Sequence, residues 1–271
     1  DCIKERREGK RINIKLPDGT FTSYISVAKS MALVHFKSLL VEPSDWCVPS
    51  LETVGVVLSF WKCIPSCFNV GDIMVMESLP SQVEIKEAVM CMSTESDWGP
   101  DGFSGSFFMD SWEVIGSHVW EAVRDFFNGG SLCRAISASK VVLIPKVSQP
   151  ELITQFHPIS LCNFSYKNLS NIFNRRHRSM IPRVVSAKQH GIIQGRGIQG
   201  AVGIAQEKVD DLNKKSISLN IIIKVEMDKA FDRLEWTFLP RILRRLGLTE
   251  WVSDLFFRCF WSPWLSIYFM G

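Results

Sequence analysis

Apolar residues recur at helical spacing through most of this chain. Ser81 and Glu84 have the spacing of a capping box at a helix start, and apolar residues follow on one face. The same period predicts several more helices. They are one ending at Leu39, one over 115–126 closed by Gly129 and Gly130, one over 165–180, one over 198–214 with Val202, Ala205, Val209 and Leu212 inward, one over 237–246, and one beginning at Thr249.

Three shorter runs have the composition of β-strands. Val141–Ile144 is β-branched and ends at a proline, Ser218–Glu226 contains the apolar run 221–223, and Trp264–Phe269 is rich in aromatic residues. Helices and strands alternate without strict regularity, which predicts an α+β fold rather than a doubly wound parallel sheet. Because Trp264–Phe269 comes last, we expect it to lack its pairing partner and to expose a sheet edge that favours aggregation.

Composition is that of a folded globular protein. The chain has 271 residues, of which 46% are hydrophobic and 22% charged, enough for one large domain or two small ones. The formal net charge of +3 does not by itself indicate a nucleic-acid partner. Basic residues nevertheless cluster at Lys4–Arg11 and at Arg175, Arg176 and Arg178. These clusters are either solvated surfaces or phosphate-binding sites.

The cysteines and the last apolar segment limit the environment of the chain. The closest cysteine pair, Cys63 and Cys67, has no further ligand at zinc spacing, so we interpret the eight cysteines as free thiols. The charged first residues do not form a secretory signal, and we expect an intracellular protein. The apolar segment 251–270 contains two charges and a proline, and we therefore do not expect it to cross a membrane.

The strongest candidate for chemistry is the segment Lys224–Trp236, KVEMDKAFDRLEW. It follows the apolar run 221–223 and contains Glu226, Asp228 and Asp232. An acid at the end of a buried strand is costly unless it is paired or used. A divalent cation is one such use, since hard cations prefer carboxylate oxygen ligands. An alternative is that Asp232 and Glu235 pair with nearby arginines at a helix start.

Several motifs occur in an order that resembles one family. The chain resembles the reverse transcriptase domain of non-LTR (LINE-type) retrotransposons, particularly those of plant genomes. The resemblance covers residues 81–271, and residues 1–80 fit the less distinctive lead-in. The matching motifs are Gly-Pro-Asp-Gly-Phe at 99–103, Val-Leu-Ile-Pro-Lys at 142–146, Phe-His-Pro-Ile-Ser-Leu-Cys-Asn at 156–163, Tyr166-Lys167, Gln189 with Gly195-Arg196, and the segment 224–236.

The resemblance implies a right-hand polymerase architecture. It divides the chain into a lead-in at 1–80, a fingers-like region at 81–217 and an incomplete palm at 218–271, with no thumb. The implied reaction is RNA-directed DNA synthesis on an RNA template and a DNA primer, from dNTPs, with Mg²⁺, in the nucleus. In this family three aspartates bind two metal ions that stabilise the displacement of pyrophosphate.

The resemblance also assigns roles to single residues. Glu226 matches the first catalytic, metal-binding carboxylate. Lys146 and the residue at 157, here His157, match basic residues that hold the triphosphate, because its developing charge needs fixed cations. Phe231, with Ala230 beside it, matches an aromatic that excludes a sugar 2′-hydroxyl. Gly195 and Arg196 match residues of the fingers or residues that contact the template.

The chain departs from the family pattern at the residues that matter most for catalysis. Glu226 replaces aspartate, and its extra methylene moves the carboxylate about 1.5 Å further out, whereas a misplacement of about 1 Å can already cost about 10²-fold in rate. His157 replaces an arginine, whose bidentate grip on phosphate an imidazole does not reproduce. The Tyr/Phe-Ala-Asp-Asp hairpin with the other two aspartates does not occur in these residues. We therefore expect the chain to be catalytically inactive as it stands.

Two other interpretations remain open. The chain could be a non-catalytic nucleic-acid-binding remnant, or a translated product that folds poorly. Each candidate residue also has a structural alternative: Lys146 as a solvated lysine, Phe231 as a core residue, and Arg196 as an ordinary loop residue. The motif at 99–103 alone would indicate only a turn.

Overall fold

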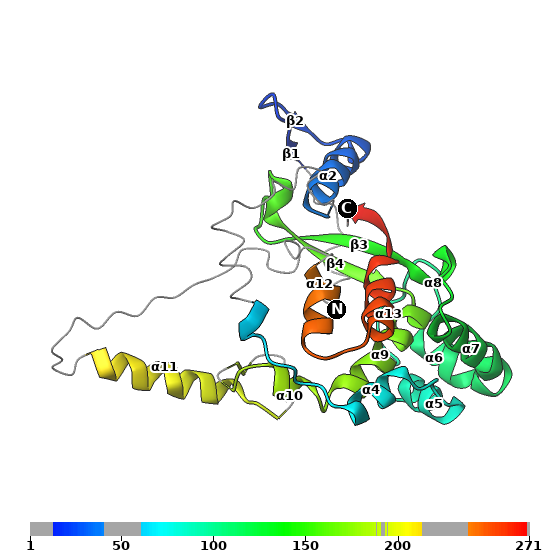
Figure 1. Ribbon diagram of the computed structural model, residues 1–271. Helices are drawn as coiled ribbons and strands as arrows, with labels where there is room; N and C mark the ends of the chain where they lie inside the picture. Colours follow the sequence, from blue (N-terminus) through cyan, green and yellow to red (C-terminus); the bar gives the residue numbers. More distant parts are fainter. Residues whose placement is uncertain are drawn as a thin grey trace.

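A computed structural model describes residues 13–40, 61–187, 189–190, 193, 195–212 and 238–269. It is an α+β fold in which helices outnumber strands (Figure 1). The helices are α2 (Ile25–Leu40), α4 (Val70–Glu77), α5 (Gln82–Met90), α6 (Gly105–Asp110), α7 (Trp112–Phe127), α8 (Arg134–Ser137), the 3-10 helix η1 (Ile153–Gln155), α9 (Phe164–His177), α10 (Ile181–Val184), α11 (Ile198–Leu212), α12 (Phe238–Arg245) and α13 (Glu250–Trp261).

The strands form two small sheets. β1 (Ile14–Lys15) and β2 (Phe21–Thr22) make an antiparallel pair. In the larger sheet β3 (Ala138–Pro145) lies between β4 (Phe156–Cys162) and β5 (Trp264–Phe269). β3 and β4 are antiparallel, whereas β5 runs parallel to β3. The last strand therefore has a partner 126 residues earlier in the sequence, with Ala138 opposite Trp264. Our expectation that this strand lacks a partner is wrong.

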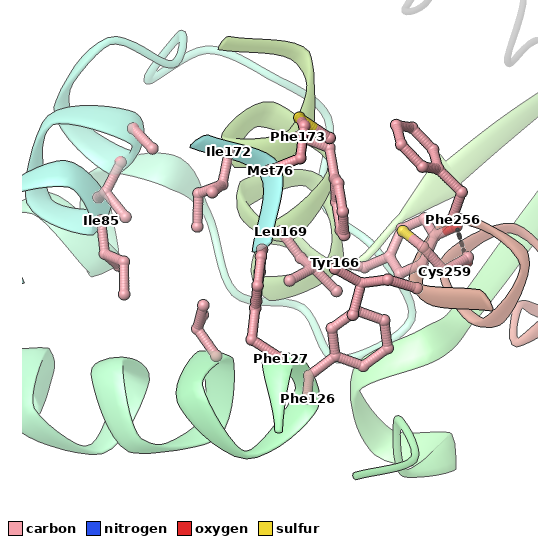
Figure 2. Close-up of a cluster of buried hydrophobic side chains, with 14 of the residues drawn as sticks. Met76, Ile85, Phe126, Phe127, Tyr166, Leu169, Ile172, Phe173, Phe256 and Cys259 are labelled. Carbon is pink, nitrogen blue, oxygen red and sulfur yellow. Dashed lines mark hydrogen bonds between the residues drawn. The ribbon is translucent and has the colours of Figure 1, made fainter. Parts of the chain in front are cut away.

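The main hydrophobic core lies among the helices (Figure 2). Rings from α7, α9 and α13 meet there, with Phe127 stacked on Phe173 at a centroid distance of 5.2 Å. The hydroxyl of Tyr166 donates a 2.8 Å hydrogen bond to the carbonyl of Cys259, which connects α9 to α13. Burial raises the pKa of the Cys259 thiol to about 11. The cysteine is thus a neutral, packed side chain at physiological pH.

A second core joins the sheet to the beginning of the described chain. Val141 and Leu143 of β3 project from one face of the sheet, where Ala28 and Ala32 of α2 pack with them. Figure 1 shows α2 lying over this side of the strands. Elements from all three regions expected from the sequence therefore contact one another. Helix α2, from the lead-in, contacts β5 of the palm region, and β5 pairs with β3 of the fingers-like region. The boundaries between those regions remain a prediction.

Helix starts agree closely with the sequence signals. The Ser81 hydroxyl accepts a 3.1 Å hydrogen bond from the amide of Glu84, and Thr249 caps α13 in the same way through the amide of Val252. Glu84 has a further role that the capping pattern does not reveal. Its two carboxylate oxygens accept hydrogen bonds of 2.6 and 2.8 Å from Arg176 on α9.

Helix α11 forms as predicted, but the expected burial of its apolar face is wrong. Val202 and Val209 are about half exposed, and none of the residues of α11 is buried. Figure 1 shows this helix extending away from the rest of the molecule. The period of a sequence identifies the apolar side of a helix but does not identify what covers it.

Candidate nucleic-acid interface

Two predicted nucleotide-binding residues lie on the same face of the large sheet. Ile144 of β3 is directly opposite His157 of β4, and directly opposed residues project to one side. Lys146 is two positions beyond Ile144, and its amide donates to the Gln155 carbonyl at 2.8 Å, so the pairing continues past the end of the strand. Lys146 is thus a diagonal neighbour of His157, and both side chains are exposed.

The same face contains an aromatic ring that two lysines approach. Val142 lies opposite Tyr268 of β5, and Lys140 opposite Ser266, which places Lys140 and Tyr268 on this side. The Lys140 ammonium lies 4.6 Å from the centroid of the Tyr268 ring, and Lys29 of α2 lies 5.3 Å from it. The ring is 41% exposed. A cation above a ring is attracted by the negative charge of its face.

A second pair of this kind occurs at the other end of β5. The Arg134 guanidinium of α8 lies 4.8 Å from the ring centroid of Trp264, which is 57% exposed. Trp264 is opposite Ala138 and therefore projects to the same side as Tyr268. We define the cation–aromatic face as Arg134, Lys140, Lys146, Trp264 and Tyr268. Within the residues that the structure describes, none of its three cations forms an ion pair.

This arrangement suits a single-stranded nucleic acid. Exposed rings provide stacking platforms for bases, and unpaired cations attract phosphates. Lys146 lies eight positions after Ala138, so the face extends for about 26 Å along β3 and its continuation, at roughly 3.3 Å per residue. Sequence reasoning found Lys146 but missed both aromatic residues. The period-two alternation of Trp264, Ser266 and Tyr268 was the available signal.

Three motifs of the sequence resemblance come together beside the sheet. Asn163 accepts a 3.2 Å hydrogen bond from the amide of Asp101 and donates one of 2.6 Å to the Ala135 carbonyl. A side chain at Gly99 would collide with Asn163, so the close approach requires glycine. Lys167 donates to the Asp97 carbonyl at 2.7 Å. These motif residues therefore hold the turn at 99–102 against the start of α9.

Arg196 is engaged within its own loop. Its guanidinium donates to the carbonyls of Ser186 at 2.6 Å and Gln189 at 2.9 Å, and two further carbonyls lie within 3.4 Å. Gly195, beside it, has a φ of +80°, where glycine is favoured. These contacts give Arg196 a loop-ordering role. A template contact by Gly195 or Arg196 stays a prediction.

The two basic clusters differ in what the structure describes. Lys4–Arg11 lies outside the described residues. Arg176 pairs with Glu84, and Arg175 donates a 2.7 Å hydrogen bond to Glu87. These two arginines therefore join α9 to α5, which favours a structural role over phosphate binding.

The predicted metal-binding segment also lies outside the described residues, and with it Glu226, Ala230 and Phe231. Within the described ranges, no three His, Cys, Asp or Glu side chains gather as a metal site would require. None of the helices in those ranges has both the length and the apolarity needed to cross a bilayer.

Comparisons with known proteins support the resemblance to a reverse transcriptase. Residues 144–269 match the family model described as reverse transcriptase (RNA-dependent DNA polymerase). The chain is also similar to the Transposon TX1 uncharacterized 149 kDa protein of Xenopus laevis, with 25% identity over 156 residues. That alignment covers 58% of this chain and 12% of the relative. The matched region includes β4 and β5 and begins at the end of β3.

Proposed function

Because this chain contains a reverse transcriptase domain of the non-LTR (LINE-type) retrotransposon family, we propose that it is part of an enzyme of RNA-directed DNA synthesis. Its substrates in that enzyme are an RNA template, a DNA primer and dNTPs, and the reaction takes place in the nucleus. The observation that carries this proposal is the placement of Lys146 and His157 as diagonal neighbours on one exposed sheet face. Two adjacent basic groups at a strand end suit the phosphates of a nucleotide.

We assign the β3–β4 pair and helices α5 to α9 to the fingers of a right-hand polymerase, and the segment from 218 onward to the beginning of its palm. Within this assignment Phe231, beside Ala230, selects deoxynucleotides by closing the space that a 2′-hydroxyl would need. β5 belongs to the palm region by sequence but pairs with a fingers strand, which fixes the two regions to each other.

We further propose that these 271 residues do not catalyse polymerisation by themselves. The reaction uses two divalent ions bridged by carboxylates. Glu226 supplies one carboxylate on a side chain that is one methylene longer than aspartate, and the residues contain no Tyr/Phe-Ala-Asp-Asp motif. This donor set does not fit a site for two Mg²⁺ ions.

A primer-extension assay tests this proposal. The purified chain is incubated with an RNA template, an annealed DNA primer, dNTPs and Mg²⁺, and we expect no extended primer. Extension that requires Mg²⁺ and disappears in Glu226→Ala, but not in the neighbouring variant Asp228→Ala, would overturn the proposal and identify Glu226 as a metal ligand.

The second candidate function is binding of single-stranded nucleic acid without catalysis. The cation–aromatic face favours it, because its exposed rings and unpaired cations do not need a metal site to act. Fluorescence anisotropy with a short labelled RNA is a direct test. Trp264→Ala should weaken binding roughly fivefold or more, the loss expected for one base stack. Trp98→Ala removes another exposed tryptophan, which lies outside this face, and should leave binding unchanged.

A further inference from the structure

A cavity of about 400 Å³ lies among helices α6, α7, α8 and α9. Its floor consists of buried apolar side chains, including Phe108, Val123 and Leu169, with exposed fractions of 7%, 5% and 2%. The volume falls within the range of small-molecule sites, which are mostly apolar with a few polar groups. No residue of the cation–aromatic face lines it.

The mouth of the cavity is aromatic. Phe103 and Phe107 line it and are 46% and 39% exposed. Their ring centroids are 4.6 Å apart with an interplanar angle of 33°. The face of a phenylalanine ring carries partial negative charge and attracts a cation that lies over it.

The mouth also contains a carboxylate. Asp101 lines the cavity, and its Oδ1 accepts a 3.2 Å hydrogen bond from the amide of Phe103. Partial burial raises the pKa of Asp101 above its usual range, an effect opposed by that hydrogen bond and by the charge of Lys167. The Lys167 ammonium itself donates to the Asp97 carbonyl and to Ser96. His118 is the other titratable side chain of the lining.

We propose that this cavity binds a small organic cation, with an apolar body in the floor and a protonated or quaternary nitrogen at the mouth. Three features carry the proposal: a buried apolar floor, two exposed rings and a carboxylate. An organic cation is attracted by both rings and acid, whereas an anion is repelled by both. This site is independent of the proposed polymerase function, and either can fail without the other.

Calorimetric titration of the full chain provides the test. The probe is (1-naphthylmethyl)trimethylammonium, and the matched anion is 1-naphthylacetate, which has the same aromatic body. We expect saturable binding of the cation at one site, roughly fivefold tighter than the anion, from one exposed ion pair and one cation–π contact. Equal affinities, or no saturable binding of the cation, would overturn the proposal.

Matched variants locate the binding. Ala122 is an exposed lining residue of α7, so Ala122→Phe should block the cavity and abolish binding without unfolding the chain. Glu121→Phe places the same ring one position away and should bind as the wild type does. Asp101→Asn keeps the hydrogen-bond acceptor but removes the charge, and should reduce the preference for the cation about threefold. Asp110→Asn, an exposed acid outside the lining, should not. Binding that survives both Ala122→Phe and Asp101→Asn would place it elsewhere and contradict the proposal.

Discussion

Replacing Arg176 by methionine should destabilise the protein far more than the same change at its neighbour Arg175. The Arg176 side chain is 5% exposed, and its guanidinium pairs with both oxygens of Glu84. It also donates to the Ser78 carbonyl at 2.5 Å and lies 5.2 Å from the ring centroid of Phe127. Removing the arginine leaves a carboxylate and a carbonyl without their donor between α4, α5 and α9.

The expected magnitude follows from burial. Breaking a buried ion pair by removing one partner costs about 3–5 kcal/mol, because the remaining charge is left unpaired. Glu84 is 26% exposed, so water can reach it in part, and we expect about 3 kcal/mol. This is a large share of a typical free energy of unfolding of about 5–15 kcal/mol. The assay is urea unfolding followed by tryptophan fluorescence and by circular dichroism.

Arg175 and Glu87 provide a matched control between the same two helices. Their 2.7 Å contact is as short, but the side chains are 31% and 57% exposed. Arg175→Met should therefore cost less than about 1 kcal/mol, as exposed pairs do. In the double variant Arg176→Met/Glu84→Gln the stranded charge is gone, and about 2 kcal/mol of the loss should return. If Arg176→Met and Arg175→Met lower the free energy of unfolding by the same amount, burial does not set the strength of these ion pairs, contrary to our prediction.

Three further predictions concern polar groups in the core. Asn168 is 1% exposed, and among the described residues neither its Oδ1 nor its Nδ2 has a hydrogen-bond partner. Asn168→Leu should therefore raise the free energy of unfolding by about 1–2 kcal/mol, whereas Asn163→Leu, at an amide whose oxygen and nitrogen both have partners, should lower it. A loss of stability in both variants would contradict this prediction. Burial lowers the pKa of His177 below its usual range, so the folded state resists protonation and the urea midpoint should fall as pH falls through the ordinary histidine value of about 6.5. His177→Gln should reduce this dependence, and an unchanged dependence in that variant would contradict the prediction. Cys259 is buried, so it should stay unlabelled by a maleimide in the folded protein, while the exposed Cys91 and Cys133 react. If Cys259 were labelled without denaturant as fast as those two cysteines, α13 would not bury it.

Local signals in the sequence predicted most helices but not all strands. Ser81 and Thr249 mark helix starts because a hydroxyl that caps a helix acts within four residues. β4 escaped notice because Pro158 lies inside it, and proline usually argues against a strand. Among the strands that the structure describes, β4 lies at the edge of its sheet, and an edge strand tolerates a proline because one side of its backbone has no neighbouring strand.

The sequence predicted only part of the candidate site, because the rest depends on which strands become neighbours. The motifs identified Lys146 and His157, and the register of β3 with β4 brings them to one face. Trp264 and Tyr268 become candidates for binding because the cations of Arg134 and Lys140 lie over their rings. These cations are more than 120 positions away in the sequence. Such pairings depend on which strands become neighbours, and a single sequence does not specify that.

We propose that the cation–aromatic face binds a single-stranded nucleic acid through its phosphates and bases. The most direct measurement is the affinity of the chain for a short single-stranded RNA over a range of salt concentrations. For the three cations of the face, we predict that log K falls with log salt with a slope of about −2, since each phosphate contact on a single strand contributes roughly −0.7. In the variant Arg134→Gln/Lys140→Gln the slope should become shallower, about −0.7, while Lys86→Gln on α5 should not change it. A slope near zero, or one that the double variant leaves unchanged, would contradict the account.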